Sequence, residues 1–243
     1  MFYQEDVKVL HPGMQAFPAA AEVFSEQQPW LSQHFLPLIS IDLGLLRPEL
    51  AGTVVHMLNP LEPSEGYIGD GTEAHHNDYT APNWLSFRLD EHNRYHFLGR
   101  EGYFQAAALH GGVFDDADAV QHREEMHSSY AQAKAYYQAE GRLGVDYGYG
   151  ETVIQSYLDS LGGDIWYGNW TVHPPIAPAF SMHIEENNND NLPDDGICIT
   201  HQGQAFLYVA EVSGYNWCAH GADAILLFYE PQSRTVLFTY DWS

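Results

Sequence analysis

The sequence is poor in positive charge. Its 243 residues include 9 Lys and Arg against 33 Asp and Glu, which gives a formal net charge of −24. Proteins that bind nucleic acid or an anionic membrane surface cluster their basic residues. The seven arginines here are scattered along the chain, at Arg47, Arg88, Arg94, Arg100, Arg123, Arg142 and Arg234. We therefore expect neither nucleic acid nor a membrane as a partner.

Cysteine and long apolar runs are also scarce. The two cysteines, Cys198 and Cys218, lack CxxC spacing, and no apolar run approaches the length of a membrane span. The first residues, MFYQEDVKVLHPG, do not have the basic start and apolar stretch of a signal peptide. The sequence predicts a cytoplasmic, soluble protein whose two cysteines are buried thiols rather than a disulfide.

Catalytic and cofactor motifs are missing as well. The sequence contains no Gly-x-Ser-x-Gly, no Gly-Lys-Ser/Thr and no Gly-x-Gly-x-x-Gly. A Cys–His pair is conceivable because Cys218 lies near His220 and His201, but a free cysteine is usually a small buried residue. We expect no cofactor and assign no catalytic residue. With 33 carboxylates, choosing an acid–base pair would be arbitrary.

What the sequence does contain is a foldable core: 45% of the residues are hydrophobic and 14% aromatic, too many for a disordered chain. Alternating residues predict a hairpin of strands at 84–89 and 94–98, and a second hairpin at 224–229 and 235–240. We expect strands at 196–201 and 204–212 to pair with the second hairpin. The last third of the chain is therefore predicted to be mostly antiparallel sheet.

Two segments resemble each other. FLPLISID at 35–42 is followed by AGTVVHML at 51–58, and FLYVAEVS at 206–213 is followed by ADAILLFY at 222–229. Both pairs keep an offset of 171 residues. This spacing suggests a pseudo-twofold duplication within a single domain, with halves at about 1–110 and 150–243 joined by a helical segment. Matched strand spacing that arose by chance remains the alternative.

Helical patterns occupy the middle of the chain. Asp115 or Asp116 can cap a helix that runs to about Glu140, where Gly141 ends it. A second helix is predicted at 151–161, where apolar residues share one face before two glycines, and a third near 16–28. Strands and helices do not alternate regularly. The predicted class is α+β, mainly antiparallel sheets with a few covering helices.

With these elements placed, the chain resembles the YwqG-like family of bacterial proteins. The matching stretches are FLPLISIDL from Phe35, GTVVHML from Gly52, LGGDIW from Leu161, FLYVAEV from Phe206, GADAILLFY from Gly221 and FTYDWS from Phe238. They cover about half of the chain and consist of apolar strands and glycines. The chain departs from the family at Leu38, where a Gln is usual, and at Gly221-Ala-Asp-Ala, where a Gly-Asp-x-Gly turn is usual. The histidine-rich segment 73–127 has no counterpart.

The resemblance implies a pseudo-symmetric α+β fold and little chemistry. Members of the family often occur beside secreted bacterial toxins, and some are thought to be immunity proteins that bind and block one toxin. Together with the charge, this favours an acidic inhibitor that binds a basic protein, a cognate toxin. The expected contacts are acidic or aromatic residues on loops and at a helix start: Glu185, Glu186, Asp190, Asp194, Asp195, Asp115, Asp116, Asp118, Tyr147 and Tyr149.

Two other interpretations remain open. The 14 histidines are densest in Glu73-Ala-His-His-Asn-Asp, so His75, His76 and Asp78 could bind a metal in a metal-dependent enzyme. That site would need a further ligand, such as His92 or His96, because neighbouring side chains of an extended segment point to opposite faces. Alternatively, the acidity serves only to keep the surface soluble in high salt.

Overall fold

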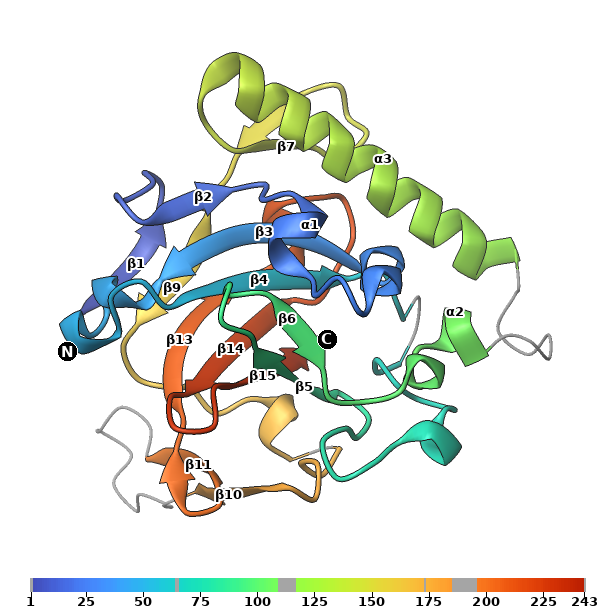
Figure 1. Ribbon diagram of the computed structural model, residues 1–243. Helices are drawn as coiled ribbons and strands as arrows, with labels where there is room; N and C mark the ends of the chain where they lie inside the picture. The colour runs from blue at the N-terminus through green and yellow to red at the C-terminus, as the bar shows by residue number, and fades with distance from the viewer. Residues whose placement is uncertain (1, 64–65, 109–116, 173, 185–195, 243) are drawn as a thin grey trace.

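The computed structural model describes residues 2–63, 66–108, 117–172, 174–184 and 196–242. A seven-stranded antiparallel sheet forms the middle of the molecule (Figure 1). Its strands, in spatial order, are β1 (Tyr3–Val7), β9 (Leu158–Gly162), β13 (Leu207–Val212), β14 (Ala224–Glu230), β15 (Thr235–Asp241), β5 (Trp84–Leu89) and β6 (Tyr95–Phe97). The outermost strands, β1 and β6, therefore lie at opposite edges.

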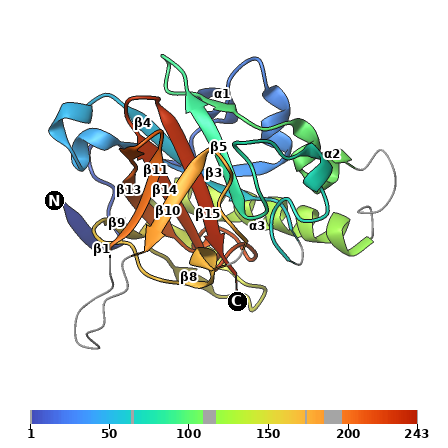
Figure 2. The same ribbon diagram turned by 90° about the horizontal axis from the view of Figure 1, so that it is seen from below.

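Smaller antiparallel sheets cover both faces of this sheet (Figures 1 and 2). On one side lie β2 (Met14–Ala16), β3 (Phe35–Asp42) and β4 (Val54–Pro60). On the other side lie β10 (Phe180–Ile184), β11 (Ile197–His201) and β12 (Gln204–Ala205). A separate hairpin is formed by β7 (Gly144–Asp146) and β8 (Thr152–Ile154).

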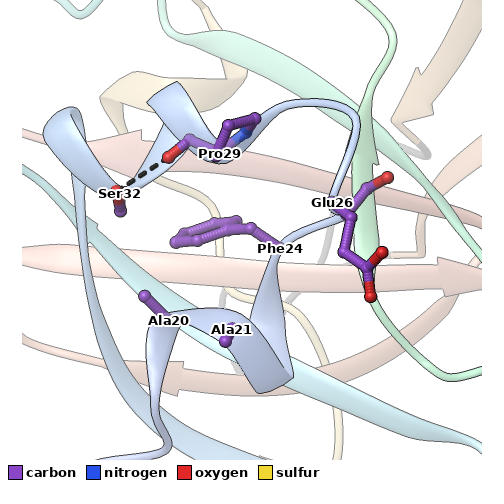
Figure 3. Close-up of a pocket in the computed structure, with 7 residues that line it drawn as sticks. Ala20, Ala21, Phe24, Glu26, Pro29 and Ser32 are labelled. Atoms are coloured by element: carbon purple, nitrogen blue, oxygen red, sulfur yellow. Dashed lines mark hydrogen bonds between the residues drawn. The ribbon is translucent and has the colours of Figure 1, made fainter.

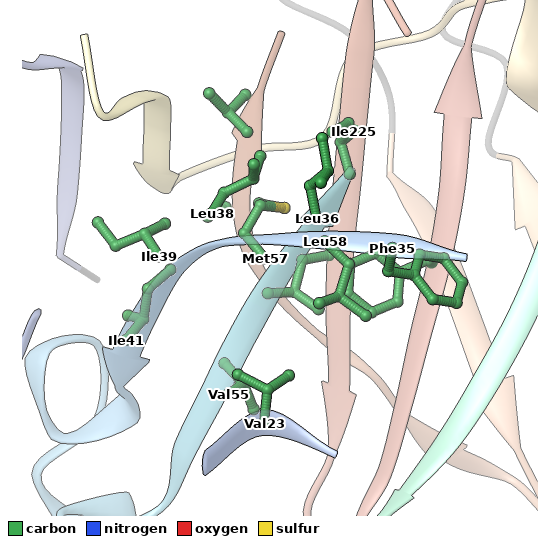
Figure 4. Close-up of a cluster of buried hydrophobic side chains, with 14 of the residues drawn as sticks. Val23, Phe35, Leu36, Leu38, Ile39, Ile41, Val55, Met57, Leu58 and Ile225 are labelled. Carbon is green, nitrogen blue, oxygen red and sulfur yellow. The ribbon is translucent and has the colours of Figure 1, made fainter. Parts of the chain in front are cut away.

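Two hydrophobic cores result, because successive residues of a strand point to opposite faces. On β15, Val236 and Phe238 enter the core shared with β3 and β4, whereas Leu237 enters the core shared with β10 and β11. Figure 4 shows part of the first core, where side chains of β3 and β4 meet Ile225 of β14. A central sheet buried on both faces explains its continuous apolar strands, such as β14.

Helices are few. They are α1 (Ala20–Val23), α2 (Gln105–Ala108), α3 (Ala117–Glu140) and the 3-10 turns η1 (Pro29–Gln33), η2 (Leu43–Leu45), η3 (Pro48–Leu50), η4 (Glu73–His75), η5 (Glu101–Tyr103), η6 (Asn169–Thr171) and η7 (Gly214–Asn216). The long helix α3 packs against β3, where the Tyr130 hydroxyl donates a hydrogen bond to the Pro37 carbonyl. It ends at Gly141, whose φ of +70° suits glycine, as the sequence predicts.

The structure confirms the predicted class, α+β with mainly antiparallel sheets and few helices. It also confirms both predicted hairpins, β5–β6 and β14–β15. The predicted helix at 151–161 is wrong: this segment forms strands β8 and β9. β9 pairs with β1 on one side and with β13 on the other. Backbone pairing on both edges outweighs the weak local helix preference.

Two further predictions need correction. Of the helix expected near 16–28, only Ala20–Val23 is helical, because Phe24 and Ser25 pair their backbone with Tyr95 at the β6 edge. The strand at 196–201 does not join the C-terminal hairpin. It pairs as β11 with β10 and β12 on the covering sheet, whereas β13 joins β14 as expected.

The two similar segments form similar hairpins, β3–β4 and β13–β14. The register shifts after Pro37 in the first and after Tyr208 in the second, positions 171 residues apart. A 3-10 turn follows each first strand, capped by the side chain of Asp42 in η2 and of Ser213 in η7. The duplication of the whole chain stays a prediction.

Candidate functional site

Most of the predicted contact residues lie outside the described residues. These are Glu185, Glu186, Asp190, Asp194, Asp195, Asp115 and Asp116. Asp118 is exposed in the first turn of α3. The acidic segment 185–195 stays a predicted contact surface.

The two predicted tyrosines lie on the β7–β8 hairpin, away from Asp118. Tyr149 is 88% exposed, but the half-buried Tyr147 donates a hydrogen bond to the Tyr215 carbonyl at 2.8 Å. The hairpin follows the C-terminal end of α3, and the 24 residues of this helix span about 36 Å. The structure therefore does not bring Asp118 together with either tyrosine.

The histidine segment is engaged in local contacts. The Nε2 atom of His76 lies 3.0 Å from the Gly69 carbonyl oxygen, and the His75 ring lies directly against Gly102. Burial lowers the pKa of His76. Among the residues that the structure describes, no group of three or more His, Cys, Asp or Glu side chains could hold a metal ion, so His75, His76 and Asp78 do not form such a group.

The cysteines are free, but only one is buried. Cys198 alternates outward on β11 and is exposed, which corrects the expectation of two buried thiols. Cys218 is fully buried, and its Sγ donates to the His220 carbonyl at 2.8 Å. Burial raises the pKa of this thiol to about 11. A nucleophilic cysteine requires a lowered pKa, so Cys218 is not activated.

A different group of acidic and aromatic residues gathers at the β1 edge of the large sheet. We call it the acidic–aromatic surface and define it by five residues: Tyr3, Glu5, Asp164, Trp166 and Glu211. The Tyr3 hydroxyl donates to Glu5, and the Trp166 indole donates to Glu211. The carboxylates of Glu5, Asp164 and Glu211 together raise the pKa of Tyr3, the hydrogen bond to Glu5 being the largest cause. These side chains are therefore close neighbours.

Strand pairing brings these residues together from distant parts of the sequence. Tyr3 of β1 lies opposite Gly162 of β9, and Glu211 of β13 lies opposite Ser160. Gly162 has a φ of +67°, and a Cβ at this position would lie 2.3 Å from the Phe2 carbonyl oxygen. Only glycine allows this approach. The close pairing of β1 with β9 is what places Tyr3 and Glu5 beside Asp164.

Glu211 is the most constrained acid of the surface. It is partly buried and also accepts a hydrogen bond from the Tyr208 hydroxyl at 3.2 Å. Burial raises its pKa, and the nearby Asp159 raises it further. Burial also raises the pKa of Asp159, with Asp6 adding to the effect. Glu211 of the surface and the adjoining Asp159 are thus carboxylates that repel each other, in a partly desolvated setting.

These carboxylates have no basic partner among the residues that the structure describes. In the described ranges, none of Glu5, Asp159, Asp164 and Glu211 forms an ion pair with Lys or Arg. Tyr3 is 52% exposed, so an aromatic ring lies beside the charges and is accessible. Chemically, the arrangement suits an external cation whose apolar part rests on an aromatic ring.

Sequence reasoning missed this surface because it assigned 151–161 to a helix. If 151–161 were a helix, Asp164 and Trp166 would follow the end of that helix. Nothing would then place them next to β1 or β13 in space. The available signal was the pair Gly162-Gly163, which marks a strand end and a sharp turn as readily as a helix end. A Cβ on Gly163 would collide with the Tyr3 ring at 2.3 Å.

Comparisons with known proteins add no relative: no family model, curated protein or solved structure matches this chain. In the part of the chain that is described, no helix has both the length and the apolar character needed to cross a membrane. The fold and the surface define an α+β protein with an acidic, aromatic sheet edge.

Proposed function

We propose that this protein binds a basic partner protein through the acidic–aromatic surface and thereby inhibits it. The observation that carries the proposal is that Glu5, Asp164 and Glu211 converge beside Tyr3 and Trp166 without a basic partner in the described chain. A Lys or Arg from a partner would relieve the repulsion among these carboxylates. The neighbouring rings would pack against its aliphatic stem.

The whole-molecule charge supports the same conclusion. A net charge of −24 steers a basic protein toward any acidic face and accelerates association, to about 10⁸–10⁹ M⁻¹s⁻¹ at low salt. Specificity then depends on a few buried anchors within a polar rim. Trp166 and Glu211 are suited to this role because both are partly buried and already held by a hydrogen bond.

The class of partner that we propose is a bacterial toxin, which makes this protein an immunity protein. An inhibitor of a lethal enzyme must capture it rapidly, and charge steering supplies speed. The proposal places the protein in the cytoplasm, where thiols stay reduced. Two free cysteines, one of them exposed, are compatible with that location.

The test is a capture experiment with two charge-matched variants. The first variant carries Glu5→Gln, Asp164→Asn and Glu211→Gln. The second, a control, removes the same charge from exposed acids elsewhere, with Glu124→Gln, Glu140→Gln and Glu151→Gln. Each tagged protein is mixed with lysate of its native cells at low salt, and bound proteins are identified by mass spectrometry.

We expect the wild type and the control to retain one stoichiometric basic protein that high salt releases, and the first variant to lose it. Addition of the wild-type protein should then abolish the activity of the purified partner. Equal capture by both variants would refute the assigned surface. A captured partner whose activity is unchanged in the complex would refute inhibition.

A further inference from the structure

Two adjoining cavities lie at the opposite edge of the large sheet, beside β6. The first, of about 370 Å³, is lined by Ala20, Ala21, Phe24, Ser25, Glu26, Pro29 and Ser32 (Figure 3). The second, of about 580 Å³, is lined by Ser25, Glu26, Gln27, Arg88, Asp90, Glu91, His92, Arg94 and His96. Ser25 and Glu26 line both, so the cavities meet at these residues. Each volume is within the range of small-molecule sites.

The first cavity is mainly apolar. The Phe24 ring lies between α1, which contributes Ala20 and Ala21, and the start of η1 at Pro29 (Figure 3). The apolar cavity forms because the chain leaves α1 in an extended conformation. The Ser25 amide then donates a hydrogen bond to the Tyr95 carbonyl at 2.9 Å. The backbone of this segment is thus fixed to β6, and the apolar cavity is open without rearrangement.

The second cavity is polar, and two of its three acidic residues, Glu26 and Asp90, share the arginine Arg94. The Arg94 guanidinium lies 2.7 Å from a Glu26 carboxylate oxygen and 3.1 Å from one of Asp90. Glu91 lies 3.6 Å from the Nε2 atom of His92. Arg94 already makes two ion pairs, so we look to another cation for an incoming anion.

Arg88 is the second arginine that lines the polar cavity. Its exposed side chain makes no hydrogen bond and no ion pair with the part of the chain that the structure describes. His96 lies directly opposite it on β6, so the two side chains are neighbours on one face of the sheet. His201 of β11 is also close enough for the positive charge of Arg88 to act on it. His201 is buried and lines neither cavity, so Arg88 and His96 are the two groups that can meet a ligand in the polar cavity.

We propose that the two cavities form one binding site for a small amphipathic organic anion. The anionic head group is bound by Arg88 and His96 in the polar cavity. The apolar portion crosses Ser25 and rests on Phe24 in the apolar cavity. A planar guanidinium binds a carboxylate or a phosphate through two parallel hydrogen bonds. The site is independent of the acidic–aromatic surface, because β1 and β6 are the two opposite edges of the sheet.

The head group is tested by isothermal titration calorimetry with octanoate as the probe. We expect octanoate to bind the wild-type protein, and Arg88→Gln to weaken binding about tenfold to hundredfold, since a charge-assisted hydrogen bond is lost. The matched control is Arg142→Gln, which removes another exposed arginine and should leave affinity unchanged. An absence of heat with the wild type, or equal weakening by both variants, would overturn the proposal.

The apolar portion is tested with acetate, inorganic phosphate and the variant Ala21→Phe, which fills the apolar cavity from its exposed rim. We expect acetate and phosphate to bind more weakly than octanoate, and Ala21→Phe to reduce octanoate affinity to that of acetate. An unchanged thermal midpoint verifies that the variant folds. Equal affinity for octanoate and acetate would show that the apolar cavity takes no part, and would overturn the amphipathic ligand.

Discussion

The indole of Trp166 donates its hydrogen bond to the carboxylate of Glu211. This contact fixes an aromatic ring and an acid as one unit, with Glu211 on a strand that lies two strands in from the β1 edge of the sheet. Because burial and Asp159 raise the pKa of Glu211, the carboxylate is held in a setting that disfavours its charge. A cation supplied from outside would stabilise that charge, which is the basis of the proposed protein–protein contact.

Replacing Glu211 by Gln should weaken binding to the partner and leave the stability of the fold almost unchanged. The amide keeps an oxygen for the Trp166 indole and loses only the charge, so we expect stability to change by less than about 1 kcal/mol. Partner affinity should fall about tenfold, as for loss of one charge-assisted hydrogen bond. Surface plasmon resonance and urea denaturation measure the two effects. The control, Glu151→Gln, removes an exposed acid and should change neither.

The salt dependence of binding should be confined to association. Charges separated by more than the Debye length, about 10 Å at 0.1 M and about 3 Å at 1 M, are screened from each other. With a net charge of −24, the association rate should drop at least tenfold between low salt and 1 M salt. The dissociation rate should change about twofold or less. Stopped-flow mixing checks this, and an unchanged association rate would exclude steering.

Glu62 should lower stability as the pH rises. It is buried and accepts hydrogen bonds from the amides of Gln105 and Ala106 at 2.8 and 3.0 Å. Burial nevertheless raises its pKa from 4.5 to about 7. The folded state therefore binds this proton more tightly than the unfolded state. The contribution is favourable at low pH and is lost between pH 4.5 and about 7.

The expected size of this effect is about 3 kcal/mol. Buried histidines such as His56, whose pKa burial lowers to about 4, act in the opposite direction and obscure it in the wild type. The measurement is therefore the difference in unfolding free energy between wild type and Glu62→Gln at several pH values. The difference should shift by about 3 kcal/mol across this window, in favour of the variant at high pH. A difference that does not vary with pH would contradict the raised pKa.

Gly162→Ala should detach β1. Its Cβ would lie 2.3 Å from the Phe2 carbonyl oxygen, and its φ is +67°. Conformational strain and the clash together should cost about 2–3 kcal/mol. The control is Gly203→Ala, where φ is +79° but no atom lies within 4 Å, so only about 1 kcal/mol is expected. Denaturant unfolding compares them, and equal losses would show that the contact with Phe2 is unimportant.

The two thiols should react at very different rates. Cys198 is exposed, whereas Cys218 is fully buried with a pKa raised to about 11. Reaction with a disulfide reagent at neutral pH should modify one thiol quickly and the second only on unfolding. In the variant Cys198→Ser, the native protein should show no fast reaction. A fast reaction in that variant would mean that Cys218 is accessible.

Local signals were sufficient for some elements. The hairpins β5–β6 and β14–β15 combine alternating apolar residues with a short connection, so their pairing depends on neighbours in the sequence. The helix α3 ends at a glycine, a signal carried by one residue. Each of these features is decided within one short stretch of chain, 84–97 and 224–241 for the two hairpins, which is why the sequence predicts them.

The acidic–aromatic surface could not be predicted in this way. The apolar spacing at 151–161 suits a helix or a strand, and the choice is decided by β1 and β13, which offer backbone partners from distant parts of the chain. The contact residues expected from the sequence are mostly acids that occur in runs, such as Asp115 and Asp116. Glu5, Asp164 and Glu211 stand apart in the sequence and become neighbours only through strand pairing.

The order of strands in the large sheet has a consequence for how the protein is made. β1 is synthesised before its neighbour β9, which ends at Gly162, and β13, which carries Glu211, comes later still. During translation, Tyr3 and Glu5 therefore lack the neighbouring strands β9 and β13 until residue 211 has left the ribosome. The proposed contact surface is therefore completed only after Glu211 of β13 has been synthesised.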